Sequence, residues 1–176
     1  MVRVAVVLVS AVLLATGCGS GVSSTQRSNQ QSVATAEQSL RSRGFSKVML
    51  QIRHVDGSIE EHCVWLADSE VERQRGLMQV TDPSLGGGEA MVFVFDQPAS
   101  GAFWMKDTVL PLSIAWVDSN GMVAGVTDMS PCPPDGGTCP EYAPPRPITM
   151  ALEMAQGRLQ DWGIEPGATL SLGKGC

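Results

Sequence analysis

The densest group of chemically versatile side chains lies between Phe103 and Thr108, in the run Phe-Trp-Met-Lys-Asp-Thr. It combines two aromatic rings, a thioether, an ammonium group, a carboxylate and a hydroxyl. If the segment is a strand, Trp104, Lys106 and Thr108 face the same side. An indole ring beside an ammonium group can bind a small polar ligand by stacking and charge. Trp104, Lys106 and Asp107 are therefore candidate ligand-binding residues.

Two more charged residues, Arg75 and Glu153, complete the candidate site because both lie within otherwise apolar or motif-like segments. The preferred interpretation of these residues is structural, with the ligand site as the alternative: Trp104 packs in the core, and the four charged candidates join a helix, a strand and a loop through ion pairs. Buried polar groups cost free energy unless they are paired. We therefore expect the Trp104–Thr108 segment at the rim of the main concave surface, where water, a ligand or a partner charge can satisfy it.

The sequence gives little support for nucleophilic catalysis, since it contains no Gly-x-Ser-x-Gly elbow. His54 and His62 flank one predicted hairpin and are interpreted as solvated edge residues. An enzyme acting on an envelope component through Lys106, Asp107 and Glu153 remains the alternative to a binding domain, and no catalytic residue is assigned. A pocket with one strongly shifted carboxylate or lysine would favour the enzyme. A flat apolar patch would favour binding.

No cofactor or metal is expected. The methionines follow apolar strand patterns without Met-x-x-Met clusters, so core packing is preferred to Cu(I) binding. Gly86-Gly87-Gly88 lacks the Lys-Ser/Thr that follows a phosphate-binding loop and is interpreted as a bend.

The cysteines other than Cys18 predict two disulfides. Cys132 and Cys139 bracket a run rich in proline and glycine that can bring its own ends together. Cys63 and Cys176 are then paired by elimination, with free thiols as the alternative. A zinc site of four thiolates is the competing interpretation, but paired Cys-x-x-Cys clusters are missing.

The N-terminus predicts export and lipidation. Arg3 precedes the apolar run Val4–Leu14, and the small residues Ala-Thr-Gly lead into Cys18. This is the order of a secretory signal, and the run is about half the roughly 20 residues of a spanning helix. We expect cleavage before Cys18 and acylation of its thiol, which would anchor the protein on the extracytoplasmic face of the cell membrane. The alternative is an ordinary secreted chain in which Cys18 is incidental.

Charge excludes one class of partner. The chain has 12 Lys and Arg against 18 Asp and Glu, a net charge of −6, which the loss of Arg3 would make more negative. Nucleic acids need a basic face, so no nucleic-acid partner is expected. Expected partners are the membrane, through the N-terminal lipid, and an unidentified small molecule or envelope protein.

Three regions follow from composition: a lipoprotein signal peptide (residues 1–17), a flexible tether with a possible short helix over 33–43 (residues 18–46), and one globular domain (residues 47–176). Short alternating apolar segments predict about seven strands, and Ser69 with Glu72 predicts a helix start. The expected fold class is α+β: a β-rich, mainly antiparallel, compact sheet or barrel-like domain with one or two short helices.

From Cys63 to Leu170 the chain resembles the family called domain of unknown function 192. The resemblance rests on five segments in order: Glu72–Met78, Ala90–Phe95, Phe103–Thr108, Pro111–Ile114, and Ala151–Glu153 with Gly157. The family usually has Asn in place of Asp107 and often Asp in place of Ser113. The resemblance implies a compact β-rich fold, often exported or lipid-anchored, and no established reaction. A lipid-anchored envelope domain that binds a small ligand or protein partner is therefore preferred.

Overall fold

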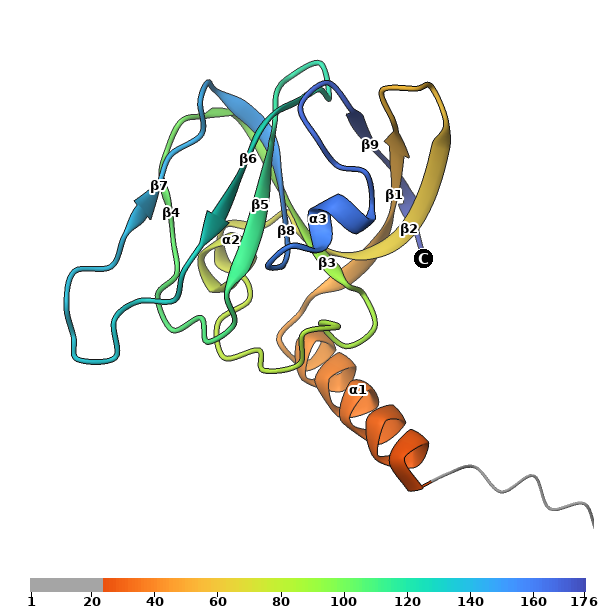
Figure 1. The fold of residues 1–176 in the computed structure, drawn as a ribbon, viewed down its shortest axis with the longest axis vertical. Helices are drawn as coiled ribbons and strands as arrows, with labels where there is room; N and C mark the ends of the chain where they lie inside the picture. Colours follow the sequence, from red (N-terminus) through yellow and green to blue (C-terminus); the bar gives the residue numbers. More distant parts are fainter. Residues whose placement is uncertain (1–23) are drawn as a thin grey trace, which may run out of the picture.

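The computed structural model describes residues 24–176, so the predicted signal peptide and Cys18 lie outside the described residues. The described chain forms three helices and nine strands (Figure 1). In chain order they are α1 Ser24–Ser42, β1 Ser46–Arg53, β2 Ile59–Ala67, α2 Glu70–Arg75, β3 Ala90–Ala99, β4 Phe103–Trp104, β5 Leu112–Val117, β6 Val123–Met129, β7 Glu141–Tyr142, β8 Ile148–Ala155, α3 Arg158–Asp161 and β9 Thr169–Gly175.

Seven strands form one sheet in the order β6-β5-β8-β3-β2-β1-β9, and β4 pairs separately with β7. All neighbours in the large sheet are antiparallel except β2 and β3, which run parallel. The predicted α+β, mainly antiparallel fold is confirmed. The sheet is not a closed barrel, because β6 and β9 form no ladder with each other. The two outer ends still meet: an isolated bridge joins Met122 to Thr169, and the Leu170 backbone N–H donates to the Gly121 carbonyl oxygen at 2.7 Å.

Side chains alternate between two apolar layers, one on each face of the sheet. Val92 on β3 and Leu152 on β8 pack in the layer that also contains Leu159 of α3. Their neighbours Met91 and Ala151 point into the opposite layer, where α1 and the chain between α2 and β3 contribute residues. The central strands are buried on both sides, which explains why they are apolar runs rather than strict alternations.

Helix α1 is longer than the sequence predicts. It begins at Ser24, in a stretch expected to be flexible, instead of at the predicted position 33. Its second half contacts the domain: Leu40 is buried in the core, and a Cβ on Gly86 would lie 2.5 Å from the backbone nitrogen of Glu37. This docking supplies stabilisation that a polar helix lacks on its own. The other end of α1 projects away from the sheet (Figure 1).

Both expected cysteine pairs are adjacent and bonded in the structure. The Cα atoms of Cys63 and Cys176 are 6.0 Å apart, and those of Cys132 and Cys139 are 4.7 Å apart. Both separations fall within the range of disulfides. The longer bridge ties β2 to the end of the chain. No helix in the described part is long and apolar enough to cross a membrane.

Candidate functional site

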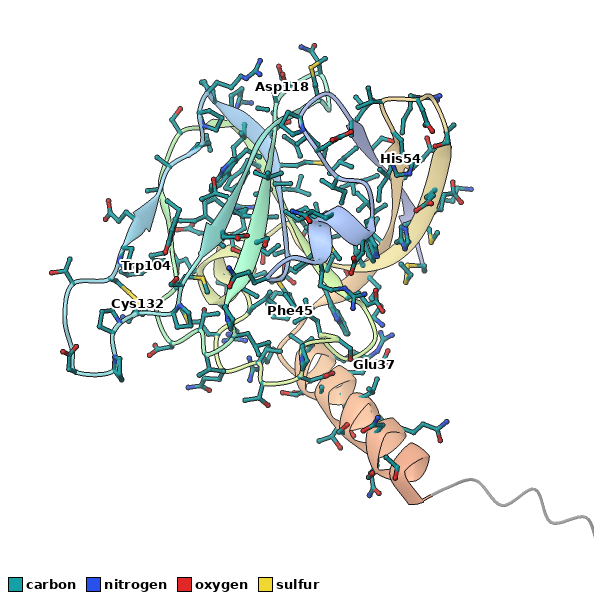
Figure 2. All side chains as sticks on the ribbon, in the orientation of Figure 1. Glu37, Phe45, His54, Trp104, Asp118 and Cys132 are labelled. Carbon is teal, nitrogen blue, oxygen red and sulfur yellow. A yellow bond between two sulfur atoms is a disulfide. The ribbon has the colours of Figure 1, made fainter. Side chains whose placement is uncertain are left out.

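A pocket of about 300 Å³ opens beside β4. Its walls are α2 and the chain just after it, the second half of β3, and the turn that follows β4, while one residue reaches it from β8. Figure 2 places Trp104 on this side of the molecule, above Cys132. The lining residues are Glu70, Arg73–Met78, Phe93, Phe95, Ala99, Gly101–Lys106, Thr108 and Glu153.

The wall formed by α2 is fixed at both ends of the helix. At the start, the Ser69 hydroxyl accepts a hydrogen bond from the Glu72 backbone N–H, and the Glu72 carboxylate accepts one from the Ser69 backbone N–H. This is the predicted capping box. At the end, Gly76 turns the chain with a φ of 45°, and a Cβ there would lie 3.1 Å from the Phe93 ring. Glycine therefore lets the wall approach β3 closely.

Aromatic rings form the apolar side of the pocket. Phe103 stands edge-on to three other rings, with centroid distances of 5.5 Å to Phe93, 6.2 Å to Phe95 and 5.2 Å to Trp116. Edge-to-face contacts of this kind stabilise aromatic clusters beyond the area that they bury. Phe103 is positioned by pairing with Tyr142 across β4 and β7. The two-stranded arm thus holds an aromatic wall over β3.

Glu153 is the one acidic group that reaches the pocket from the sheet. Glu153 lies on β8, and its partners on the two adjacent strands are Met91 on β3 and Ile114 on β5, both fully buried. The residue is 6 % exposed, and no hydrogen bond or ion pair joins its carboxyl group to another residue within 24–176. The residue lines the pocket. Burial raises the pKa of this carboxyl group to about 8.

The rim carries Trp104 and Lys106. Trp104 is 54 % exposed, and the Lys106 ammonium group lies 5.4 Å from the centroid of its indole ring. The strand is shorter than predicted: β4 ends at Trp104, and the next residues form a turn in which Asp107 has a φ of 53°. The Thr108 hydroxyl donates a hydrogen bond to the Lys106 carbonyl oxygen inside this turn. This hydrogen bond fixes the backbone of the turn from which the Lys106 side chain extends at the pocket mouth.

Two arginines on α2 are held by backbone carbonyl groups. The Arg73 guanidinium donates to the carbonyl oxygens of Val94, at 2.9 Å, and Asp68, and it lies over the Phe95 ring at 5.4 Å. Arg75 donates to the Arg43 carbonyl oxygen at 3.0 Å. These hydrogen bonds tie α2 to β3 and to the turn just after α1. Both arginines line the pocket.

The model of the DUF192 family, described as an uncharacterized ACR, matches residues 51–172. The chain belongs to the DUF192 family. The match begins within β1 and ends within β9, so it contains the five strands of the large sheet that lie between them in the sequence and every residue that lines the pocket.

Two solved structures are similar to this DUF192 protein. A Novosphingobium aromaticivorans DSM 12444 protein of unknown function is 27 % identical, with a TM-score of 0.60, over 71 % of this chain and 84 % of that chain. A Sinorhizobium meliloti 1021 protein, described as a proposed transcription regulator, is 24 % identical, with a TM-score of 0.61, over 73 % and 95 %. The second likeness concerns the fold alone. None of the curated proteins compared with the chain matches it.

The DUF192 domain brings four of the five predicted ligand-binding residues to one pocket: Arg75, Trp104, Lys106 and Glu153. Asp107 is the exception, because its side chain does not line the pocket. Its backbone carbonyl accepts a hydrogen bond from the Gln79 backbone N–H at 2.8 Å, which ties the rim to the wall after α2. Its left-handed backbone is one that Asn and Asp tolerate better than most residues, and this suits the Asn usual in the family.

The expected ion pairs among the charged candidates are missing. None of the salt bridges in residues 24–176 involves Arg75, Lys106, Asp107 or Glu153. The other family departure, Ser113, forms a different network: its hydroxyl donates to Asp128 and accepts from the Gly157 backbone N–H. The polar groups of the pocket are therefore not used to hold the elements together by charge.

Sequence reasoning missed the aromatic wall and Arg73. Phe93 and Phe95 lie on the same face of β3 and belong to the family segment Ala90–Phe95, but an apolar run such as Met-Val-Phe-Val-Phe is equally typical of a buried strand. The useful signal was the periodicity of two, which places both rings beside the Glu72–Met78 segment once that segment packs on β3. Which segment packs there depends on the tertiary fold.

The histidines lie elsewhere in the DUF192 domain, at the β1–β2 end, where Figure 2 labels His54 on the side opposite Trp104. The His62 ring stacks on Trp162, and both histidines approach the Glu60 carboxylate. Within the described residues no group of three or more His, Cys, Asp or Glu side chains could hold a metal ion. Neither histidine is available to the pocket.

Proposed function

We propose that this DUF192 protein is a lipid-anchored domain on the extracytoplasmic face of the cell membrane, and that it binds a small ligand in the pocket beside β4. The observation that carries ligand binding is Glu153. A buried carboxyl group without a partner destabilises a fold, so its presence is best explained by a bound molecule that satisfies it. Pockets of a few hundred Å³ with apolar walls and few polar groups are typical ligand sites.

Ligand binding can be tested with a neutral aromatic probe, para-acetylphenylpropanol, by following backbone amide shifts in NMR titrations. At roughly 0.3 kcal/mol per heavy atom, a probe of this size binds in the millimolar range. We expect saturable shifts around Phe93 and Phe103. Ala102→Trp places a large ring at the pocket mouth and should abolish them, since Ala102 lines the pocket.

The matched control is Val109→Trp, which adds the same ring at an exposed position outside the pocket lining. It should leave the titration unchanged. Absence of saturable shifts, or equal loss in both variants, would contradict ligand binding in this pocket.

The anchor is supported by the signal that ends at Cys18 and by the two disulfides, which suit an oxidising compartment. Two acyl chains are the number usually needed for stable attachment. Cys18→Ala should move the protein from the membrane fraction to the soluble fraction and remove labelling by a palmitate analogue. A Cys18→Ala protein that still sediments with membranes would rule out the anchor.

A second candidate function is an enzyme that uses Glu153 as a general acid. The raised pKa favours it, because a carboxylic acid that keeps its proton near neutral pH can donate it in a reaction. General acid–base chemistry also needs a second positioned group, and Glu153 has no partner within the described residues. Incubating the protein with an isolated cell-envelope fraction tests this candidate: products seen by mass spectrometry should disappear with Glu153→Gln.

A further inference from the structure

Resting on the proposed function, we infer that the ligand class is a small amphipathic organic anion. Its apolar or aromatic body lies against Phe93, Phe95 and Phe103. Its inner end carries a carbonyl or ether oxygen that accepts a hydrogen bond from Glu153, and its outer end carries a negative group beside Lys106.

The inner end of the pocket provides a hydrogen-bond donor. Glu153 lies between Met91 and Ile114 on the sheet, where neither neighbour can accept a proton or share a charge. With a pKa of about 8, the carboxyl group is mostly protonated at pH 7. A protonated carboxyl group has one O–H donor, and the position is otherwise apolar. An oxygen acceptor on the ligand is the complementary group.

The middle of the pocket selects an apolar body. Rings from β3 and β4 meet there edge-on, and Leu77 and Met105, both buried, complete the wall. A flat aromatic or aliphatic body of the ligand would displace water from these surfaces, and burial of apolar area is the main favourable term in such binding. The polar contacts are thereby restricted to the two ends.

The outer end is cationic although the whole chain is acidic, with a net charge of −6. Three cations, Arg73, Arg75 and Lys106, line the pocket against one exposed acid, Glu70. Both arginines already donate to carbonyl oxygens, whereas Lys106 has no ion pair within the described residues. Lys106 is therefore the group that can pair with a negative charge on the ligand.

An organic amine is the competing class, because carboxylates and aromatic rings also bind ammonium groups. It would require Glu153 to lose its proton inside an apolar site, and it would meet repulsion from the three cations at the rim. The two classes predict opposite responses to pH, and this makes them separable.

The experiment compares three probes that share one body: para-acetylphenylpropanoate, the neutral para-acetylphenylpropanol and para-acetylphenylpropylamine, each titrated into the full folded domain at pH 6 to 9. We expect the anion to bind roughly fivefold more tightly than the alcohol, as a partly exposed ion pair allows, and the amine to bind most weakly. Affinity for the alcohol should fall as pH rises through about 8, because the Glu153 donor is lost.

Two variants assign the effects to residues. Lys106→Gln should reduce the ratio of anion affinity to alcohol affinity to about one, whereas Lys174→Gln, the same charge change at an exposed position on β9, should leave that ratio intact. Glu153→Gln keeps an N–H donor but does not titrate, so it should remove the pH dependence.

The outcomes separate this inference from the function on which it rests. If the alcohol binds in the pocket but the anion gains nothing, or if the amine binds best and tightens with rising pH, the anionic class is wrong and ligand binding stands. If no probe binds, or if Ala102→Trp changes nothing, the proposed function fails as well.

Discussion

At the residue scale, Glu153 is the residue whose chemical type fits its surroundings in the fold least well. Between Leu152 and Met154, which face the opposite layer, it occupies a site flanked by Met91 and Ile114. An apolar residue of similar size would suit the fold better. Groups that lower stability and have a shifted pKa concentrate at functional sites, and the pocket around Glu153 fits that rule.

Glu153→Gln should therefore stabilise the domain, by an amount that grows with pH. The folded pKa is raised from 4.5 to about 8, so the folded protein holds a proton that the unfolded chain has lost, and stability falls as pH rises through this window. Gln does not titrate and avoids that loss. The gain should be small at pH 4, about 3 kcal/mol at pH 7, and constant above pH 8.

Urea unfolding at pH 4, 7 and 9 measures this gain. Glu165→Gln, which removes an exposed carboxylate, is the matched control and should show no such trend. A gain for Glu153→Gln that does not depend on pH would show that Glu153 titrates normally in the folded protein.

At the element scale, the pocket depends on how closely α2 and its following turn pack on β3. The capping box starts the helix, and Gly76 ends it against Phe93. The Arg73 side chain joins α2 to β3 by donating a hydrogen bond to the Val94 carbonyl oxygen. The wall is thus held by backbone geometry and hydrogen bonds, and its charged side chains form no ion pairs within residues 24–176.

Gly76→Ala should destabilise the domain by about 2 kcal/mol, since the methyl group meets Phe93 and the backbone keeps a positive φ. It should also weaken probe binding in the pocket, because the wall must move outward. Gly101→Ala is the control: Gly101 also lines the pocket, but a Cβ there meets nothing within 4 Å. Thermal unfolding measures both variants, and an equal loss of stability in the two would contradict the close packing of Gly76.

At the whole-molecule scale, the two disulfides act over very different lengths of chain. Cys63–Cys176 joins positions separated by 113 residues and ties the end of β9 to β2, whereas Cys132–Cys139 spans 7 residues in a loop beyond the sheet. In the chain-entropy model a cross-link restricts the unfolded chain more when the loop is longer. The long bridge should therefore contribute more to global stability.

Replacing Cys63 and Cys176 together by Ala should lower the free energy of unfolding by roughly 4–5 kcal/mol, and replacing Cys132 and Cys139 by roughly 2–3 kcal/mol. Urea denaturation of the two double variants, each without reductant, gives the comparison. If the short bridge proved the more costly to remove, the loop from 132 to 139 would have a role in the fold that its position does not indicate.

The sequence by itself determined the local features of this protein. Alternation and apolar runs located β5 and β8, Ser69 and Glu72 located the start of α2, and the cysteines indicated the two pairs. The order of the segments pointed to the family. These features follow from interactions within a few residues, or from counting, and so are readable along the chain.

Only the tertiary structure decided which segments are neighbours. β8 lies between β3 and β5, although both precede it in sequence, and this places Glu153 between the apolar side chains of Met91 and Ile114. The pocket joins α2, β3 and the turn after β4, and the contact between Gly86 and Glu37 docks α1 on the domain, which the possible short helix over 33–43 did not indicate. The periodicity of a strand predicts which face of the sheet a side chain lies on, whereas contacts between segments distant in sequence determine what covers that face.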